Sequence, residues 1–266
     1  MTSFDAVVYG VVQGVTEYLP ISSSAHLILL PRVLGVEDPG LAFDVFLHLG
    51  TLLATVGFFW RDWWAILFPR GSVGASDGQT GLSFKLIVVA TVPALVAGAL
   101  LHHLAETIFR SPYVLIGTLA LGGILLAVVD RKCSSVRSLR SITYKDAFWV
   151  GCFQCLALVP GMSRSGSTMM GARFLGFERS DAARFSFLIS GPVTAAAVVF
   201  ELRKFGALVD SIGDVWVLII AFATSLIAGV LTIRWLLGVV RKIGFDIFMI
   251  YRVLLAGVLA IWLFRS

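Results

Sequence analysis

Two polar, helix-breaking stretches interrupt long hydrophobic regions and decide the fold class of this chain. Residues 19–26 read LPISSSAH, and residues 159–168 read VPGMSRSGST. They lie near the middles of two apolar regions, about 4–34 and 146–176. Non-helical backbone at the depth of a bilayer is stable only where it is buried in protein or lines a wet cavity. Each interruption therefore predicts a polar site inside a membrane protein.

The composition outside these stretches is that of a membrane protein. Of the 266 residues, 58% are hydrophobic and 14% are charged, whereas a soluble domain has about 25% charged residues. This excludes a disordered chain, a secreted disulfide scaffold and a nucleic-acid-binding domain, so no nucleic acid partner is expected. Cys133, Cys152 and Cys155 are an odd number, and the CxxC spacing of the last two is interpreted as packing.

Six uninterrupted stretches are long and apolar enough to cross a hydrocarbon core, which takes about 20 helical residues. We predict a polar loop from Gly71 to Gly81 and a basic cytoplasmic loop over 131–145. The predicted spans are 42–60, 84–104, 112–130, 184–202, 213–235 and 245–264.

The two interrupted regions are related by an internal duplication. A single shift of 141 residues pairs Gln13 with Gln154 and Ser22 with Ser163, and identities continue in that register to Phe59. Because polar and charged residues are among them, shared hydrophobicity does not explain the match. The chain therefore reads as one membrane domain, 1–266, with repeat 1 over about 1–130 and repeat 2 over about 145–266.

Charge favours one topology for the interrupted regions. If both dip into the membrane and return to the side they came from, most Lys and Arg residues fall on one side, a stronger bias than if both cross. The prediction is thus an all-α polytopic membrane protein with six transmembrane helices and two re-entrant helical hairpins. An odd number of crossings separates the repeats, so they form an inverted-topology repeat with both termini outside.

The first interruption carries a carboxylate beside hydroxyl and imidazole groups. Glu17 lies four residues after Gln13, so both point from one helix face toward Ser22, Ser23, Ser24 and His26. An intramembrane carboxylate is costly and usually functional. Ser23 and His26 are three residues apart and suit a nucleophile with its base, and an imidazole can also accept a phosphoryl group itself. His48, His102 and His103 have no such neighbours and are interpreted as packing residues.

The second interruption has the composition of a phosphate cradle. Arg164 is flanked by Ser163 and Ser165, with Gly166 and Thr168 following. A helix over Ser165–Arg173 would aim its N-terminal amides at the same point. Arg164 is alternatively the neutralising partner of Glu17 across the repeat interface, and both roles are compatible. Asp246 and Arg252, in the last predicted span, are interpreted either as residues at the membrane interface or as a pair behind the site.

The stretches VQGVTEYLPISSSAH (12–26) and PGMSRSGST (160–168) resemble the two signatures of the undecaprenyl-diphosphate phosphatase, or bacitracin-resistance, family. The likeness spans nearly the whole chain, including the run 151–158. It implies hydrolysis of undecaprenyl diphosphate to the monophosphate, which recycles the lipid carrier for peptidoglycan synthesis in the bacterial inner membrane. It also implies a divalent cation, Mg²⁺ or Ca²⁺. Glu17, Ser23, His26 and Arg164 fall on the family's functional positions.

The resemblance frames a mechanism with open alternatives. Ser23 is the preferred nucleophile with His26 as its base, and water activated at His26 or Glu17 is the second possibility. Glu17 and the Gln13 carbonyl are the candidate cation ligands, although Gln13 stands where the family also uses a second carboxylate. The candidate substrate-binding residues are Gln13, Ser22, Ser24, Ser163, Ser165, Gly166 and Thr168.

Other classes of function remain open. A polyprenyl-phosphate flippase or ion-coupled transporter fits the inverted repeat alone. A purely structural scaffold leaves the intramembrane charges unexplained. Membrane lipid is an expected partner, and a homodimer is allowed by the sequence.

Overall fold

A computed structural model describes residues 1–69, 81–106, 111–133, 135–201, 203 and 205–265, apart from the side chains of 102–106 and 265. The predicted loop over Gly71–Gly81 thus lies almost wholly outside the described residues, as do the side chains of His102 and His103. The chain is all-α, as predicted. Its helices are α1 (Ser3–Thr16), α2 (Ser23–Leu34), α3 (Leu41–Phe58), α4 (Trp60–Leu67), α5 (Phe84–Glu106), α6 (Pro112–Lys132), α7 (Tyr144–Gln154), α8 (Arg164–Phe174), α9 (Arg179–Glu201), α10 (Phe205–Ile212), α11 (Val215–Ile243) and α12 (Asp246–Arg265).

The predicted membrane spans correspond to α3, α5, α6, α9, α11 and α12, each long and apolar enough to cross a bilayer. Two boundaries differ from the prediction. α9 begins at Arg179, five residues earlier, and α11 continues to Ile243, past residue 235. Both extensions contain charged residues, which suits positions beyond the hydrocarbon core. The segments stay helical there because a helix satisfies its own backbone hydrogen bonds.

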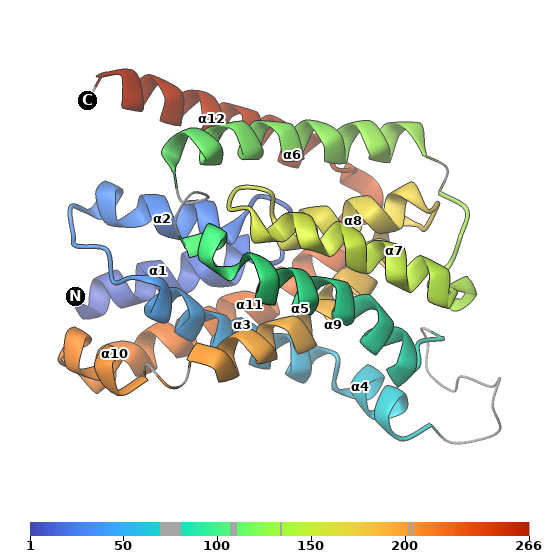
Figure 1. The fold of residues 1–266 in the computed structure, drawn as a ribbon, viewed down its shortest axis with the longest axis horizontal. Helices are drawn as coiled ribbons and strands as arrows, with labels where there is room; N and C mark the ends of the chain where they lie inside the picture. Colours follow the sequence, from blue (N-terminus) through green and yellow to red (C-terminus); the bar gives the residue numbers. More distant parts are fainter. Residues whose placement is uncertain (70–80, 107–110, 134, 202, 204, 266) are drawn as a thin grey trace.

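The interrupted regions form two helical hairpins, α1–α2 and α7–α8, broken where the sequence indicates. Residues 17–22 connect α1 to α2, and a 3-10 turn at Cys155–Leu158 followed by a loop connects α7 to α8. In Figure 1 the α1–α2 pair lies toward the end of the molecule that holds both termini, and α7–α8 lies toward the opposite end, so that their connecting segments meet between them. This arrangement agrees with re-entrant hairpins, whose course through a bilayer remains a prediction.

The two hairpins begin with the same local structure. Thr2 and Asp5 form a capping box at the start of α1, and Thr143 and Asp146 form one at the start of α7. In each, the Thr hydroxyl and the Asp carboxylate satisfy backbone amides that the first helical turn leaves unpaired. The two pairs are separated by the same 141 residues as the sequence repeat. The shared capping box therefore supports the predicted duplication.

Each hairpin packs against a helix of the other repeat. α1 packs on α11 and α7 packs on α5. The approach is close because of glycine: a Cβ on Gly14 would lie 2.6 Å from the Ser225 carbonyl oxygen, and one on Gly151 would lie 2.5 Å from the Ala90 carbonyl oxygen. Small residues permit such contact between membrane helices. The interlocked repeats hold both hairpin tips at the centre of the molecule.

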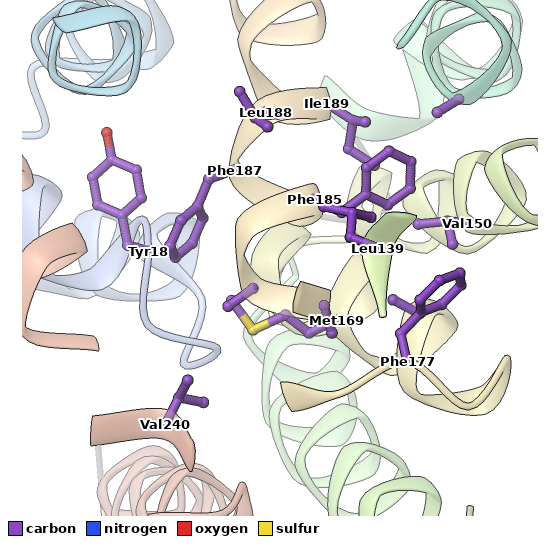
Figure 2. Packing of buried hydrophobic residues seen from close by; sticks show 14 of the residues in the cluster. Tyr18, Leu139, Val150, Met169, Phe177, Phe185, Phe187, Leu188, Ile189 and Val240 are labelled. Carbon is purple, nitrogen blue, oxygen red and sulfur yellow. The ribbon is translucent and has the colours of Figure 1, made fainter. Parts of the chain in front are cut away.

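Aromatic packing fixes the end of α1. Tyr18 is 2% exposed and meets Phe187 of α9 edge to face, with ring centroids 5.1 Å apart. Figure 2 shows these two rings facing one another at the edge of the buried cluster. The Tyr18 hydroxyl also donates to the Thr51 carbonyl oxygen of α3. Tyr18, which follows Glu17 in the chain, is therefore anchored against two transmembrane helices, α3 and α9.

Candidate active site

A strained serine marks each hairpin tip. Ser22 precedes α2 with a φ of 74°, and Ser163 precedes α8 with a φ of 69°. They are the non-glycine residues with positive φ among those described, and they are partners in the repeat. Such conformations cost about 1–3 kcal/mol and concentrate at functional sites. The backbone strain thus falls at the two points where the sequence places the site.

The Glu17 carboxylate is the centre of the site. Its Oε2 accepts hydrogen bonds from the Ser23 hydroxyl at 2.6 Å and from Gln13 Nε2 at 3.1 Å. Its Oε1 is paired with the Arg164 guanidinium. The Glu17 side chain is 10% exposed, and a buried charge of this kind requires such partners. The Ser23 hydroxyl is therefore held with its proton directed at a carboxylate oxygen.

Arg164 brings the second hairpin to the same point. Besides Glu17, its guanidinium donates to the Thr194 hydroxyl of α9 at 2.7 Å. The neighbouring Ser165 hydroxyl donates to the Leu19 carbonyl oxygen of the first hairpin at 3.0 Å. The expected meeting of Glu17 and Arg164 is thus present, and the predicted helix start is confirmed, with α8 running from Arg164 to Phe174.

The expected pairing of Ser23 with His26 is wrong in this structure. His26 Nδ1 lies 2.7 Å from the Ser22 carbonyl oxygen, and Nε2 lies 2.7 Å from the Tyr251 hydroxyl. The His26 and Tyr251 rings are also stacked. Both ring nitrogens are engaged because the first turn of α2 carries His26 toward α12, away from Glu17. His26 therefore joins the hairpin to α12, and the Ser23 hydroxyl is paired with Glu17 instead.

The remaining predicted binding residues divide into two groups. Ser22, Ser24 and Ser163 line the pocket beside Ser23 and Arg164. Gly166 and Thr168 instead complete α8. The Gly166 amide donates to the Ser163 hydroxyl, and the fully buried Thr168 hydroxyl is bonded to Ser186 of α9. The Gly166 amide, predicted to bind phosphate, thus donates to the N-cap of α8, and Thr168 lies on the face of α8 that packs against α9.

His48 is a site residue that the sequence analysis missed. Its Nε2 lies 3.2 Å from Glu17 Oε2, and its Nδ1 lies 2.7 Å from the Asp44 carbonyl oxygen. The interpretation of His48 as a packing residue is therefore wrong. α3 passes behind the first hairpin and brings His48 to Glu17, a contact that no local spacing predicts. The available signal was its position as an ionisable side chain inside an apolar span.

Arg252 holds the two tips together from α12. It is fully buried, and its guanidinium donates to the carbonyl oxygens of Pro20 in the first tip and of Gly161 and Met162 in the second. The expected pairing with Asp246 is wrong, because Asp246 lies two turns earlier in α12 and binds Arg131. Arg252 thus satisfies carbonyl groups that the helix breaks leave without intrahelical donors.

Glu17, Ser23, His48 and Arg164 line a polar pocket of about 160 Å³. The volume suits a head group and is too small for a polyprenyl chain, since pockets for drug-sized ligands span about 300–1,000 Å³. The lining residues are Glu17, Ser22, Ser23, Ser24, His48, Ala94, Gln154, Ala157, Leu158, Ser163, Arg164 and Val193.

The site offers little protein ligation for a metal ion. The described residues contain no group of three or more His, Cys, Asp or Glu side chains that would bind one. Gln13 Oε1, a candidate cation ligand, is buried and accepts no hydrogen bond in the described part of the chain, but Gln13 turns its Nε2 toward Glu17 and does not line the pocket. Amide and carboxylate oxygens suit Mg²⁺, which is commonly held by one or two protein groups and substrate phosphates.

The placement of the two histidines predicts unequal effects of their removal. His48→Ala should lower turnover by about 10²-fold, because Glu17 loses a partner that fixes Oε2 against Ser23 and small misplacements cost about that much. His26→Ala should lower turnover by less than about 10-fold, because its ring nitrogens contact neither Ser23 nor Glu17. Initial rates of phosphate release would test this. An equal or larger loss in His26→Ala would instead favour His26 as the base.

The fold and the pocket together define an integral membrane protein with a hydroxyl, a carboxylate and a guanidinium gathered where two helical hairpins meet. Residues 6–258 match the model of the family described as "Bacitracin resistance protein BacA". The chain belongs to this family. Curated relatives named undecaprenyl-diphosphatase include those of Gemmatimonas aurantiaca, 45% identical with 96% of each chain covered, of Desulforudis audaxviator, 45% identical over 96% of this chain and 95% of that one, and of Hahella chejuensis, 44% identical over 99% of both.

Proposed function

We propose that this chain is a membrane phosphatase that hydrolyses undecaprenyl diphosphate to undecaprenyl phosphate and phosphate. The observation that carries the proposal is the contact of the Ser23 hydroxyl with Glu17 beside Arg164, in a pocket sized for a head group. The reaction would recycle the lipid carrier for peptidoglycan synthesis, and the family that the chain matches is described by bacitracin resistance. The polyprenyl tail would remain among lipids, outside the polar pocket.

In the first chemical step, Ser23 Oγ attacks the terminal phosphorus of the diphosphate. The Oγ–P bond forms, the bridging P–O bond breaks, and undecaprenyl phosphate leaves as a dianion. The Ser23 proton moves to Glu17 Oε2, its hydrogen-bond acceptor in the structure. A carboxylate within hydrogen-bond distance of a hydroxyl meets the geometric requirement for a general base. Attack by water, activated at Glu17, is the alternative first step.

Arg164 supplies positive charge to the transferring phosphoryl group. A guanidinium has five N–H donors, and the structure assigns contacts with Glu17 and Thr194 to two of its nitrogens. The remaining donors are available to phosphate oxygens, where preorganised charge lowers the barrier. A divalent cation, Mg²⁺ or Ca²⁺, would neutralise further charge on the diphosphate when bound, and Glu17 and Gln13 are the residues that would hold it.

Phosphate release tests the proposed function directly. Purified protein in detergent micelles, given undecaprenyl diphosphate and Mg²⁺, should release inorganic phosphate, and Glu17→Ala should release far less. Arg131→Ala is the matched control, because Arg131 is an exposed arginine that pairs with Asp246 outside the pocket. Binding of the substrate by wild-type protein without phosphate release would favour the alternative function, a polyprenyl-phosphate flippase or ion-coupled transporter.

The proposed location is the bacterial inner membrane, with both termini outside and the substrate entering from the outer leaflet. The first hairpin would then open outward and the basic segment 131–145 would face the cytoplasm. Oligomeric state enters the proposal only as a possible homodimer, which the reaction does not require.

Cysteine labelling in intact cells tests this orientation. In a variant with Cys133, Cys152 and Cys155 replaced by alanine, Glu37→Cys should react with a membrane-impermeant maleimide, and Ser135→Cys should react only after the cells are lysed. Both positions are exposed, and they lie on predicted opposite faces. Labelling of Ser135→Cys in intact cells, with Glu37→Cys protected, would reverse the orientation.

A further inference from the structure

Two glutamines occupy equivalent positions in the two repeats, and in each the side-chain NH₂ group donates a hydrogen bond. Gln13 and Gln154 are both buried, at 0% and 2% exposed. Gln13 Nε2 donates to Glu17 Oε2 at 3.1 Å, and Gln154 Nε2 donates to the Ala90 carbonyl oxygen of α5 at 3.3 Å. Carboxylate and carbonyl oxygens can only accept hydrogen bonds, so each contact fixes which end of the amide is the NH₂ group.

The other end of each amide has no partner. Gln13 Oε1 and Gln154 Oε1 are buried and accept no hydrogen bond from any residue that the structure describes. An unsatisfied buried acceptor costs about 1–3 kcal/mol and calls for an explanation. Gln154, unlike Gln13, lines the polar pocket together with Ser23, Glu17 and Arg164. Its unsatisfied oxygen is thus an acceptor buried in the wall of a chamber where the hydroxyl and guanidinium groups are donors.

The chemistry of the pocket limits what this oxygen can bind. Ionised phosphate oxygens are acceptors, and the Ser23 hydroxyl already donates to Glu17. A neutral carbonyl therefore suits a small molecule with O–H groups and a free lone pair, which is water. In other phosphoryl-transfer sites a glutamine orients the attacking water in this way.

We propose that Gln154 orients the water that hydrolyses phosphorylated Ser23, an inference that rests on the proposed function. One water O–H donates to Gln154 Oε1, which directs a lone pair of the water oxygen at phosphorus. A new O–P bond forms and the Ser23 Oγ–P bond breaks. The Ser23 oxygen takes back the proton that Glu17 received in the first step, and phosphate leaves as H₂PO₄⁻ with both protons of the water. The Gln154 amide neither gains nor loses a proton in this step.

This assignment separates the two halves of the reaction. Loss of the Gln154 acceptor slows hydrolysis of the phosphoserine and leaves its formation nearly unchanged. A merely structural glutamine would slow both steps together, because Ser23, Glu17 and Arg164 would shift. The amount of covalent phosphoenzyme during turnover therefore distinguishes a water-positioning residue from a packing residue.

The experiment measures phosphoenzyme and turnover in Gln154→Leu, with undecaprenyl diphosphate labelled in its terminal phosphate. Turnover should fall by about 10²-fold, the usual cost of a misplaced reactant. Acid-quenched protein should retain label on Ser23 at a higher level than wild type. Cys152→Ala, two residues earlier in α7 and outside the pocket lining, is the matched control and should behave as wild type. Gln154→Met, which keeps the length of the side chain without the acceptor, repeats the test if Gln154→Leu folds poorly.

Three results would overturn the assignment. Equal slowing of both steps without retained label would make Gln154 structural. A changed Mg²⁺ requirement with unchanged phosphoenzyme would make it a cation ligand. Reduced turnover with no label on Ser23 in either variant would exclude the phosphoserine route. Failure of the wild-type protein to release phosphate is a separate result, which removes the proposed function itself.

Discussion

Replacing Arg164 with alanine should lower phosphate release from undecaprenyl diphosphate by about 10³-fold, equivalent to about 4 kcal/mol of transition-state stabilisation. The guanidinium is the positive group that reaches the pocket from the second hairpin, and it has no equivalent in the first, where Ser23 occupies the matching position. Charge that develops on the transferring phosphoryl group would then have no arginine partner.

Arg164→Lys refines this prediction. It should recover about 10-fold over alanine, because lysine restores charge and lacks the planar set of donors that bridges Glu17 and Thr194. Initial rates at saturating substrate would measure both variants, with Arg131→Ala as the control. Retention of more than a tenth of wild-type turnover by Arg164→Ala would place the phosphoryl group elsewhere.

Replacing Ser23 with alanine should abolish turnover, with a loss on the order of 10³-fold or more, as for other enzymes that lose a nucleophile. The structure gives Ser23 Oγ the contact with Glu17 that activation requires. The variant should still bind substrate, since Arg164 and the other pocket serines remain.

Phosphoenzyme trapping and rates together would check the Ser23 prediction. Wild-type protein quenched in acid during turnover should carry phosphate on Ser23, and Ser23→Ala should carry none. Ser138→Ala, a serine in the segment after α6, is a suitable control. Full activity in Ser23→Ala would establish direct attack by water and would leave Glu17 as its base.

Periodicity and composition predicted the architecture well, because membrane helices must satisfy their own backbone. The long apolar stretches correctly predicted the transmembrane helices, and the polar interruptions correctly predicted where the hairpin helices break. The inversion of the two hairpins also predicted that Glu17 and Arg164 meet, although the sequence separates them by 147 residues. That prediction needed only the inverted arrangement of the repeats, without any knowledge of side-chain geometry.

The errors lie where a helix rotation or a distant helix decides the contact. His26 is three residues after Ser23, a spacing that allows contact, but the start of α2 at Ser23 turns His26 toward Tyr251. His48 and Arg252 reach the tips from α3 and α12, and their partners are set by packing between helices that no local pattern encodes. Treating every ionisable residue inside a span as a site candidate would have included His48, whereas Arg252 was a candidate with the wrong partner.

The contact between Glu17 and Arg164 ties both hairpins into one site, and a double-mutant cycle on thermal unfolding in detergent tests that contact most directly. Glu17→Gln and Arg164→Met should each lower the melting temperature, because each leaves the other charge buried without its ion partner. The double variant should recover much of the loss, with a coupling energy of about 1–3 kcal/mol. Strictly additive losses would mean that the two side chains do not touch, and the account of a shared site would fail.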